Sequence, residues 1–377
     1  MVKRSRSVIR TALLGMLLLP SLAAFPANLV VPSLELLTRG VVENTTLVLK
    51  SYGQMDLSIE GGYKFGGRLG VTYTSGTGDL ERAASKSLSF SGASIIVKDV
   101  FSLPLDISYF IGQNDTLCSG EGFSTAFGTA QIMTSYRGFM YFPAGVIYDG
   151  IYSVNGTGTR IDIAPSRESL LFSLYAYEDT HPPSTGPVAL GMFSGDFRVL
   201  VNFEPIKMEG FIGGSYSSAA AANGRYRGGM LFFWNNGPLE LLAQIGLPVF
   251  DPNVDTLTLD LFYFLFEPRL HLGFLSVVPT FFLHPISYEQ NKNLTEQGSF
   301  DINLNIYAGD LSKSSLRGGL ETLLNYKSAT GDIVIKTSPY VGFATPGALW
   351  TFKICATLSP FDFTNMLEGF VGVRAEF

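Results

Sequence analysis

Charged side chains recur at alternate positions along this chain, separated by apolar residues and glycines. In the stretch Met55–Tyr73 the odd positions are apolar, aromatic or glycine, while the even positions include Asp56, Glu60, Lys64 and Arg68. Because successive side chains of a β-strand point to opposite faces, this spacing gathers both signs of charge on one face. Such a face could line an aqueous passage and select solutes by charge and size. Alternatively, the charges pair across strands and only fill a polar interior.

The same alternation of charged and apolar residues identifies further candidate lining residues in later segments of the chain. The complete set is Asp56, Glu60, Lys64, Arg68, Asp106, Asp196, Arg198, Arg225, Arg227, Glu240, Lys353, Arg374 and Glu376. One region departs from the pattern, because Leu261–Phe266 is apolar at every position. An interior lined there by Phe262, Phe264 and Phe266 would offer an apolar path to lipids or fatty acids. The alternative for this region is a strand that packs against an interior loop.

Groupings that would support catalysis or metal binding are weak. His284 has Ser287 close to it in sequence, but a proline lies between them and gives this pairing no particular support. The two cysteines, Cys118 and Cys355, lie far apart, so unpaired thiols are favoured over a disulfide. Two cysteines and three histidines give no zinc-type spacing, and no glycine-rich stretch has the spacing of a phosphate loop. We therefore expect no enzyme activity, no cofactor and no bound metal.

The amino-terminal residues have the layout of a secretory signal peptide. Four basic residues precede the short apolar run Thr11–Pro20, and the small residues of Ser21–Ala24 follow it. We predict a signal peptide at 1–24, cleaved between Ala23 and Ala27. Its removal leaves 22 of the 26 basic residues against 32 acidic ones, a net charge of −10. An acidic chain without clustered Lys and Arg argues against a nucleic-acid partner.

Composition indicates that much of the folded surface does not face water. Apolar residues make up 46% of the chain and charged residues 15%, whereas a soluble domain usually carries about a quarter charged residues. After the predicted signal no uninterrupted apolar run is long enough for a spanning helix, and Leu257–Leu283, which comes nearest, contains several charges. Only helices and closed barrels satisfy all backbone groups in lipid. The remaining class is an all-β, transmembrane, antiparallel up-and-down β-barrel.

The spacing of turn residues gives the number of strands and the arrangement of loops. Short turns are predicted at Glu204-Pro205, Asn235–Gly237, Glu267-Pro268 and Thr345–Gly347, and longer connections at Ser75–Lys86, Gly112–Gln131, Glu178–Leu190, Ser217–Asn223 and Ser287–Gly298. About 16 strands, with a range of 14 to 18, then fit residues 44–377 as one barrel. Residues 25–43 contain Ser33–Gly40, which could form one or two helical turns. We expect 25–43 to be a periplasmic lead-in or a small plug.

The carboxy-terminal segment Leu367–Phe377 alternates apolar or glycine residues with mostly polar ones and ends on an aromatic residue. It resembles the terminal strand of bacterial outer-membrane β-barrel proteins. That resemblance implies that Val371, Val373 and Phe377 belong to the signal read by the barrel-assembly machinery. It also implies a Gram-negative-type envelope, with outer-membrane lipid as the surroundings. The low charge of the chain is similar to that of spirochaetal barrels.

The resemblance and the two-faced strands together predict a porin-like channel for passive diffusion of small solutes. Gly112–Gln131 is the longest candidate for a loop that folds inward and narrows the lumen, and the acidic excess predicts a mild preference for cations. One alternative is a transporter of hydrophobic ligands such as fatty acids. Another is a surface adhesin or structural barrel. The sequence leaves the solute and the oligomeric state open.

Overall fold

The computed structural model describes residues 28–43, 46–61, 64–77, 87–136, 150–180, 192–217, 224–253, 255–283, 285, 300–309, 315–327, 330–362 and 366–375, without the side chains of 28–33, 43, 60, 74–77 and 87. The predicted signal peptide at 1–24 and its cleavage zone therefore lie outside the described residues. So do Glu376, Phe377, His284 and Ser287. In the part of the chain that is described, no helix is long and apolar enough to cross a membrane.

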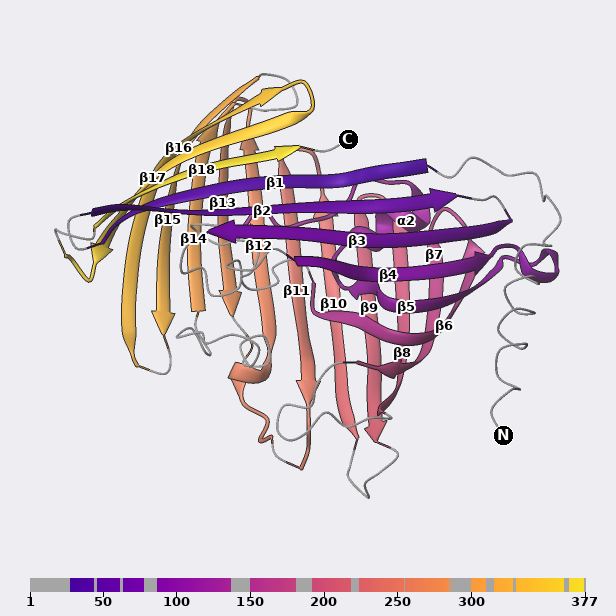
Figure 1. The fold of residues 1–377 in the computed structure, drawn as a ribbon. Helices are drawn as coiled ribbons and strands as arrows, with labels where there is room; N and C mark the ends of the chain where they lie inside the picture. The colour runs from indigo at the N-terminus through magenta and orange to yellow at the C-terminus, as the bar shows by residue number, and fades with distance from the viewer. Residues whose placement is uncertain are drawn as a thin grey trace, which may run out of the picture.

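The described residues form one antiparallel sheet that closes on itself (Figure 1). The strands are β1 (Asn28–Glu43), β2 (Thr46–Gly61), β3 (Phe65–Thr77), β4 (Ser87–Val97), β5 (Leu105–Leu117), β6 (Tyr152–Ser166), β7 (Leu170–Asp179), β8 (Met192–Phe203), β9 (Ile206–Ser217), β10 (Arg225–Asn235), β11 (Leu239–Phe250), β12 (Tyr263–Leu272), β13 (Leu275–Leu283), β14 (Phe300–Ala308), β15 (Leu316–Lys327), β16 (Asp332–Thr345), β17 (Ala348–Ser359) and β18 (Leu367–Ala375). Each strand pairs with its neighbours in sequence, and β1 pairs with both β2 and β18. The last pairing closes the barrel and leaves no terminal strand at a free edge.

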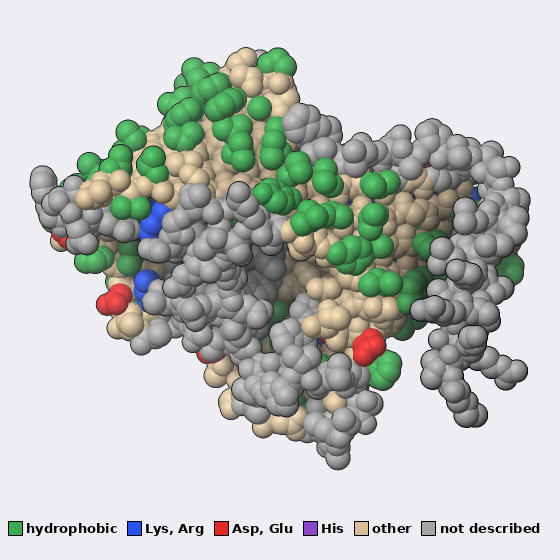
Figure 2. Space-filling view, viewed as in Figure 1, with side chains coloured by type: hydrophobic (Ala, Val, Ile, Leu, Met, Phe, Trp, Pro, Cys, Tyr) green, Lys and Arg blue, Asp and Glu red, His purple; other side chains and the backbone are tan. Residues whose placement is uncertain are grey.

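Alternation along each strand sorts the side chains between an inner and an outer face. In β8, Phe193 and Phe197 are 59% and 42% exposed, whereas Asp196 and Arg198 are 1% and 2% exposed. Exposed leucine, isoleucine, valine and phenylalanine side chains likewise occupy the outer faces of the other strands. Figure 2 shows hydrophobic side chains gathered over the strands on the visible face, with few charged ones between them. An apolar exterior around a polar interior is the arrangement that a membrane-spanning barrel requires.

Short turns and long connections alternate around the barrel. Glu204-Pro205 joins β8 to β9, residues 236–238 join β10 to β11, and residues 346–347 join β16 to β17, as predicted. The predicted turn at Glu267-Pro268 is wrong, because both residues lie within β12. The chain reverses instead at Gly273, whose φ of +67° suits glycine.

The expected number of strands was too small, since eighteen are present in the described residues. The expected lead-in or plug at 25–43 is wrong for Asn28–Glu43, which form β1. Leu34 and Leu36 point outward, while Glu35 and Leu37 point inward and are 7% and 5% exposed. The alternation was hidden in the sequence because Leu37 faces the interior although it is apolar, so that two leucines, Leu36 and Leu37, stand side by side.

The paired ends of β5 and β6 leave the wall and fold into the barrel. β4 and β5 pair only as far as Gly92 and Gly112, whereas β5 continues to pair with β6 as far as Leu117 and Tyr152. A Cβ on the inward side of Gly92 would lie 2.3 Å from the Gln113 carbonyl oxygen, so β5 crosses directly over the inner side of β4. We call Gln113–Leu117 with Tyr152–Asn155 the inward ribbon.

Candidate functional site: the barrel lumen

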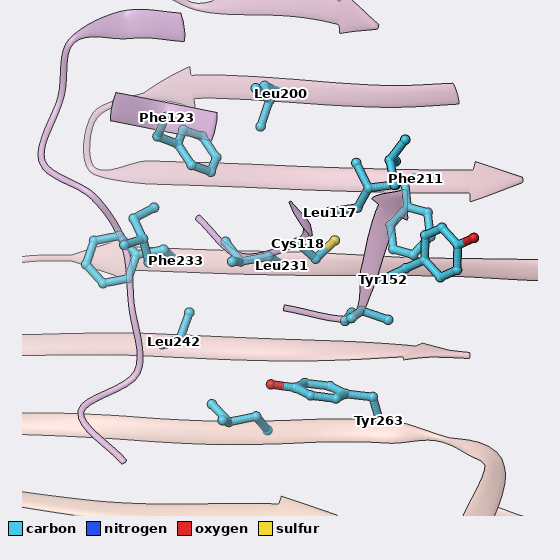
Figure 3. Close-up of a cluster of buried hydrophobic side chains, with 14 of the residues drawn as sticks. Leu117, Cys118, Phe123, Tyr152, Leu200, Phe211, Leu231, Phe233, Leu242 and Tyr263 are labelled. Atoms are coloured by element: carbon cyan, nitrogen blue, oxygen red, sulfur yellow. The ribbon is translucent and has the colours of Figure 1, made fainter. Parts of the chain in front are cut away.

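The segment Cys118–Tyr136 continues from the inward ribbon and lies against the inner surface of β8 to β14. We call it the inner segment; it contains the helix α2 (Glu121–Phe127), which Figure 1 shows enclosed by the strands. Phe123 of α2 is fully buried, as are Leu200 of β8 and Leu231 of β10 (Figure 3). The same close-up shows Cys118 above Leu231. Apolar packing therefore holds the first half of the inner segment to this part of the wall.

The beginning of the inner segment is anchored to two polar side chains of the wall. The Cys118 N–H donates a hydrogen bond to Glu209 Oε1 in β9 at 2.6 Å, and Gln244 in β11 donates its Nε2–H to the Cys118 carbonyl at 2.5 Å. Gln244 in turn accepts a hydrogen bond from the Tyr263 hydroxyl at 3.2 Å. Burial raises the pKa of the Cys118 thiol well above its ordinary value, and the nearby Glu209 carboxylate raises it further. Cys118 and Cys355 are both buried and unpaired, as expected.

The end of the inner segment is anchored to Glu267 of β12, a carboxylate with no exposed surface. Its oxygens accept hydrogen bonds from the Thr134 hydroxyl at 2.6 Å and from the Ser135 N–H at 3.0 Å. Arg269 donates its Nε–H to the same carboxylate at 2.7 Å, and the Thr280 hydroxyl donates at 2.9 Å. A carboxylate with this many donors is fully satisfied, and removing any one donor would leave part of a buried charge uncompensated.

A third anchor lies one residue further along the inner segment. The Tyr136 hydroxyl donates to Asp301 Oδ2 of β14 at 2.7 Å, and Asn325 of β15 donates to Asp301 Oδ1 at 2.6 Å. The anchors on Glu209, Glu267 and Asp301 follow one another around the wall. The inner segment is therefore fixed along its length to the strands from β9 to β14. We call the strands from β6 to β14 the covered wall.

Buried ion pairs fill the space behind the inward ribbon and the inner segment. Arg198 Nε lies 2.8 Å from Glu209 Oε1, and Arg227 Nε lies 2.6 Å from Asp196 Oδ1. The Arg227 guanidinium also lies over the Tyr152 ring of the inward ribbon, 4.2 Å from its centroid. Because these charges are desolvated and paired, they hold the ribbon in place.

Cavities lie along the remaining strands, β1–β5 and β15–β18, which we call the open wall. A cavity of about 370 Å³ is lined by Asp56, Arg68, Gln113 and, from α2, Glu121. A cavity of about 250 Å³ lies at β14–β18 and β1, lined by Arg317, Glu321, Lys353 and Arg374 among others. A third, of about 280 Å³, lies below α2 between the two walls and includes Lys98, Asp106 and Arg160. Their linings carry both signs of charge.

The predicted lining residues divide between the two walls. Four of them line cavities at the open wall: Asp56, Arg68, Lys353 and Arg374. The cavity below α2 is lined by Asp106. Three are buried behind the inward ribbon and inner segment, namely Asp196, Arg198 and Arg227, and two lie on the inner face of β10 and β11, namely Arg225 and Glu240. Arg225 lies 3.6 Å from Asp251, and Glu240 lies 3.0 Å from Arg269. Lys64 is exposed between β2 and β3. The side chain of Glu60 lies outside the described residues, as does all of Glu376.

The expected apolar path through Phe262, Phe264 and Phe266 is wrong. Tyr263 and Leu265 have no exposed surface and share the inner face of β12 with Glu267, so Phe264 and Phe266 point outward. Phe266 meets the Phe281 ring of β13 at a centroid distance of 6.2 Å on that outer face. Phe262 precedes β12 and lines none of the cavities described above.

The structure also places two of the three predicted assembly-signal residues and shows acids that the sequence analysis did not identify. Val371 and Val373 lie on the outer face of β18, and Phe377 lies outside the described residues. Sequence reasoning missed the anchoring acids Glu209, Glu267 and Asp301. Glu209 shares its parity with Lys207 in β9, so the alternation could have placed it inside. In the described part of the chain, no cluster of three or more His, Cys, Asp or Glu could hold a metal.

Comparisons with known proteins place this architecture among outer-membrane barrels. No protein-family model and no curated protein sequence matches the chain. The chain resembles the crystal structure of Acinetobacter baumannii OccAB3 with a TM-score of 0.52 and 10% identity, over 94% of this chain and 100% of that chain. It resembles Pseudomonas aeruginosa OccK8 (OprE) with a TM-score of 0.52 and 10% identity, over 93% and 98% of the two chains. The chain has the fold of bacterial outer-membrane porins.

A further structural relative gives the same result. Pseudomonas aeruginosa OccD3 (OpdP) matches with a TM-score of 0.50 and 9% identity, over 94% of this chain and 92% of that chain. Because each comparison covers nearly the whole of both chains, the likeness extends to the complete barrel. The prediction of a porin-like outer-membrane barrel is confirmed at the level of the fold.

Proposed function

We propose that this chain is an outer-membrane channel through which small hydrophilic solutes diffuse passively. The observation that carries this proposal is the asymmetric filling of the lumen. The inner segment is fixed against the covered wall, while cavities of about 370 and 250 Å³ lie along the open wall. A segment that narrows a lumen without filling it is suited to a size-selective pore.

Charges on the open wall supply the selectivity of the proposed channel. Asp56 and Glu121 face the same cavity as Arg68, and Glu321 faces the same cavity as Lys353 and Arg374. Opposite charges across a narrow water-filled space create a transverse field, which orients dipolar solutes and favours their passage over apolar ones. The net charge of −10 expected for the mature chain favours a mild preference for cations.

We also propose the cellular context that this function needs. Residues 1–24 direct export, and the carboxy-terminal strand with Val371, Val373 and Phe377 is read by the barrel-assembly machinery. The apolar outer face then lies in outer-membrane lipid. The channel has no enzymatic activity and needs no cofactor, because its work is done by the shape and charge of the lumen.

The proposal is tested by single-channel recording of the refolded mature chain in a planar bilayer. We expect discrete openings and a reversal potential in a salt gradient that shows cation preference. A variant in which Gly120–Thr129 is replaced by a short glycine-serine linker should give larger openings, since α2 no longer occupies the lumen. A folded barrel that never conducts would contradict the channel, and anion preference would contradict the assigned selectivity.

A further inference from the structure

In the described residues, the strand pairing of the wall is incomplete between β4 and β7. β3 pairs with β4 as far as Ser87, but β4 pairs with β5 only as far as Gly92. Among the described residues, Ser87–Ser91 of β4 therefore have no strand partner on the side of β5. Five residues of strand correspond to an edge of about 16 Å.

The interruption arises because the inward ribbon folds away from both neighbours. On one side, a Cβ at Gly112 would lie 2.6 Å from the Ser91 carbonyl oxygen, which marks where β5 crosses inside β4. On the other side, a Cβ at Gly158 of β6 would lie 2.3 Å from the Tyr177 Cβ of β7. Only glycine permits approaches this close, so the fold of the ribbon is built into the sequence.

The exposed edge lies at a level where the outer surface is still apolar. Leu88 and Phe90 point outward from the edge and are 72% and 53% exposed, and Ile111 of β5 is 46% exposed below it. Backbone N–H and C=O groups at hydrocarbon depth need hydrogen-bonding partners, which lipid tails do not provide. The backbone groups of this edge therefore need a polar partner beyond the paired strands.

The interior side of the interruption is polar. The cavity of about 370 Å³ is lined there by Ser91, Gln113, Asn114 and Thr116, together with Asp56 across the lumen. A molecule lying in the gap would thus have apolar side chains around its outer end and hydroxyl, amide and carboxylate groups around its inner end. This contrast fits one chemical class, an amphiphile with a polar head and a single hydrocarbon chain.

We propose that the gap between β4 and the inward ribbon is a lateral opening that admits the head groups of single-chain amphiphiles from the membrane into the lumen. The head group hydrogen-bonds the free edge of β4 and the polar cavity lining, while the chain stays beside Leu88 and Phe90. This route is independent of ion conduction along the barrel axis.

The test uses the full mature chain refolded into phosphatidylcholine vesicles that contain a palmitic acid analogue with a diazirine near its carboxyl group. After photolysis, labelled positions are mapped by mass spectrometry. We expect label on the segments 91–94 and 113–116, which line the cavity. The variant Gln113→Trp, which fills the gap from the inside, should lower that labelling at least fivefold. Ile354→Trp, at a 62% exposed position on the outer face of β17, is the matched control and should not change it.

Each outcome decides the proposal, provided that both variants keep the heat-modifiable gel mobility of a folded barrel. Label confined to outward residues all around the barrel would overturn it. Cavity label that Gln113→Trp does not reduce would also overturn it, because the probe would then enter through the mouth of the barrel. Ion conductance is measured on the same preparations. A chain that conducts ions but takes no cavity label loses the lateral opening and keeps the channel.

Discussion

The covered wall and the open wall are built from the same alternation of residues, yet their inward-facing charges have different surroundings. On the covered wall, Glu209 and Glu267 have no exposed surface and receive hydrogen bonds from the inner segment. On the open wall, Glu35 and Glu321 are 7% and 5% exposed, but Arg68 is exposed and the Arg374 side chain keeps 28% of its surface. The difference shows that the alternation along a strand places a charge inside the barrel. Whether solutes can reach that charge depends on whether the inner segment packs over it.

The two walls should also differ in energetics. Removing one partner of a buried pair leaves an uncompensated charge in a medium that solvates it poorly, which is costly. Removing a charge beside a water-filled cavity changes little, because water replaces the partner. Covered-wall substitutions should therefore act on stability and on the inner segment, and open-wall substitutions on selectivity.

The largest loss of stability is expected for Arg227→Met. Arg227 donates to both oxygens of Asp196 at 2.6 and 2.7 Å, and Asp196 is 1% exposed. The abandoned carboxylate should cost about 3 to 5 kcal/mol of the free energy of unfolding, measured by urea titration in lipid vesicles. Arg167→Met is the control, since Arg167 and its partner Asp99 are 64% and 49% exposed and should contribute less than about 1 kcal/mol. Equal losses in the two variants would erase the distinction between buried and exposed pairs.

Glu267→Gln should release the end of the inner segment. The neutral amide loses charge-assisted hydrogen bonds with Thr134, Ser135 and Arg269, worth about 1.5 to 3 kcal/mol. Single-channel recordings should then show larger and noisier openings, because the segment moves in the lumen. Glu240→Gln removes a partly exposed carboxylate from the same arginine and should leave the openings quiet. Quiet, unchanged openings in Glu267→Gln would show that this anchor does not position the segment.

Gly92→Val tests whether the inward ribbon depends on the close crossing of β4 and β5. Its Cβ would meet the Gln113 carbonyl oxygen at 2.3 Å, so overpacking should cost about 1 to 3 kcal/mol of unfolding free energy. Gly369→Val is the matched control on β18, where nothing lies within 4 Å of the added Cβ, and should change stability by less than about 0.5 kcal/mol. If both valines were tolerated equally, the ribbon would have to sit farther from β4 than described.

On the open wall, neutralising single charges should shift selectivity with little loss of stability. Asp56→Asn should move the reversal potential toward anion preference, and Arg68→Gln should move it toward cation preference, because both line one cavity. Each should cost less than about 1 kcal/mol in unfolding free energy. An unchanged reversal potential in both variants would show that this cavity is not on the ion path.

The smallest expected effect concerns the reactivity of Cys118. Burial raises the pKa of its thiol, so little thiolate forms at pH 8 and alkylation of the folded chain by iodoacetamide should be slow. Thr125→Cys, at an exposed position of α2, should react quickly in the same molecule. The neutral thiol contributes to stability fully below the pKa of an unfolded thiol, about 8.5, and this contribution is lost as pH rises through the raised folded value. Rapid alkylation of Cys118 below pH 8 would contradict the packing of the inner segment.

Much of the barrel could be predicted because period-two alternation is a local property of the sequence. It placed Asp56, Arg198 and Arg227 on the inner face before any tertiary contact was known. It failed at β1, where Leu37 is apolar and faces inward. It also failed at β12, because Glu267-Pro268 was predicted to be a turn. If Glu267, Arg269 and His271 had been read as alternate residues of one strand, they would have been placed on its inner face. Phe264 and Phe266 would then have been predicted to point outward.

The covered wall could not be predicted because its defining contacts are remote in sequence. Gly112–Gln131 was correctly expected to fold inward, but its partners were not identified. Cys118 meets Glu209 across 91 positions, and Thr134 meets Glu267 across 133. No local pattern distinguishes an acid that receives these donors from one that faces water.

The most direct test of the two-wall account is the accessibility of single introduced cysteines during single-channel recording. Arg68→Cys lies in a cavity of the open wall, and Phe233→Cys replaces a side chain of the covered wall that is 9% exposed. The unmodified chain serves as the control, since Cys118 and Cys355 are buried. A water-soluble, negatively charged thiol reagent should reduce the current of the Arg68→Cys channel in discrete steps and leave the Phe233→Cys channel unchanged. Block at Phe233→Cys without block at Arg68→Cys would contradict the account.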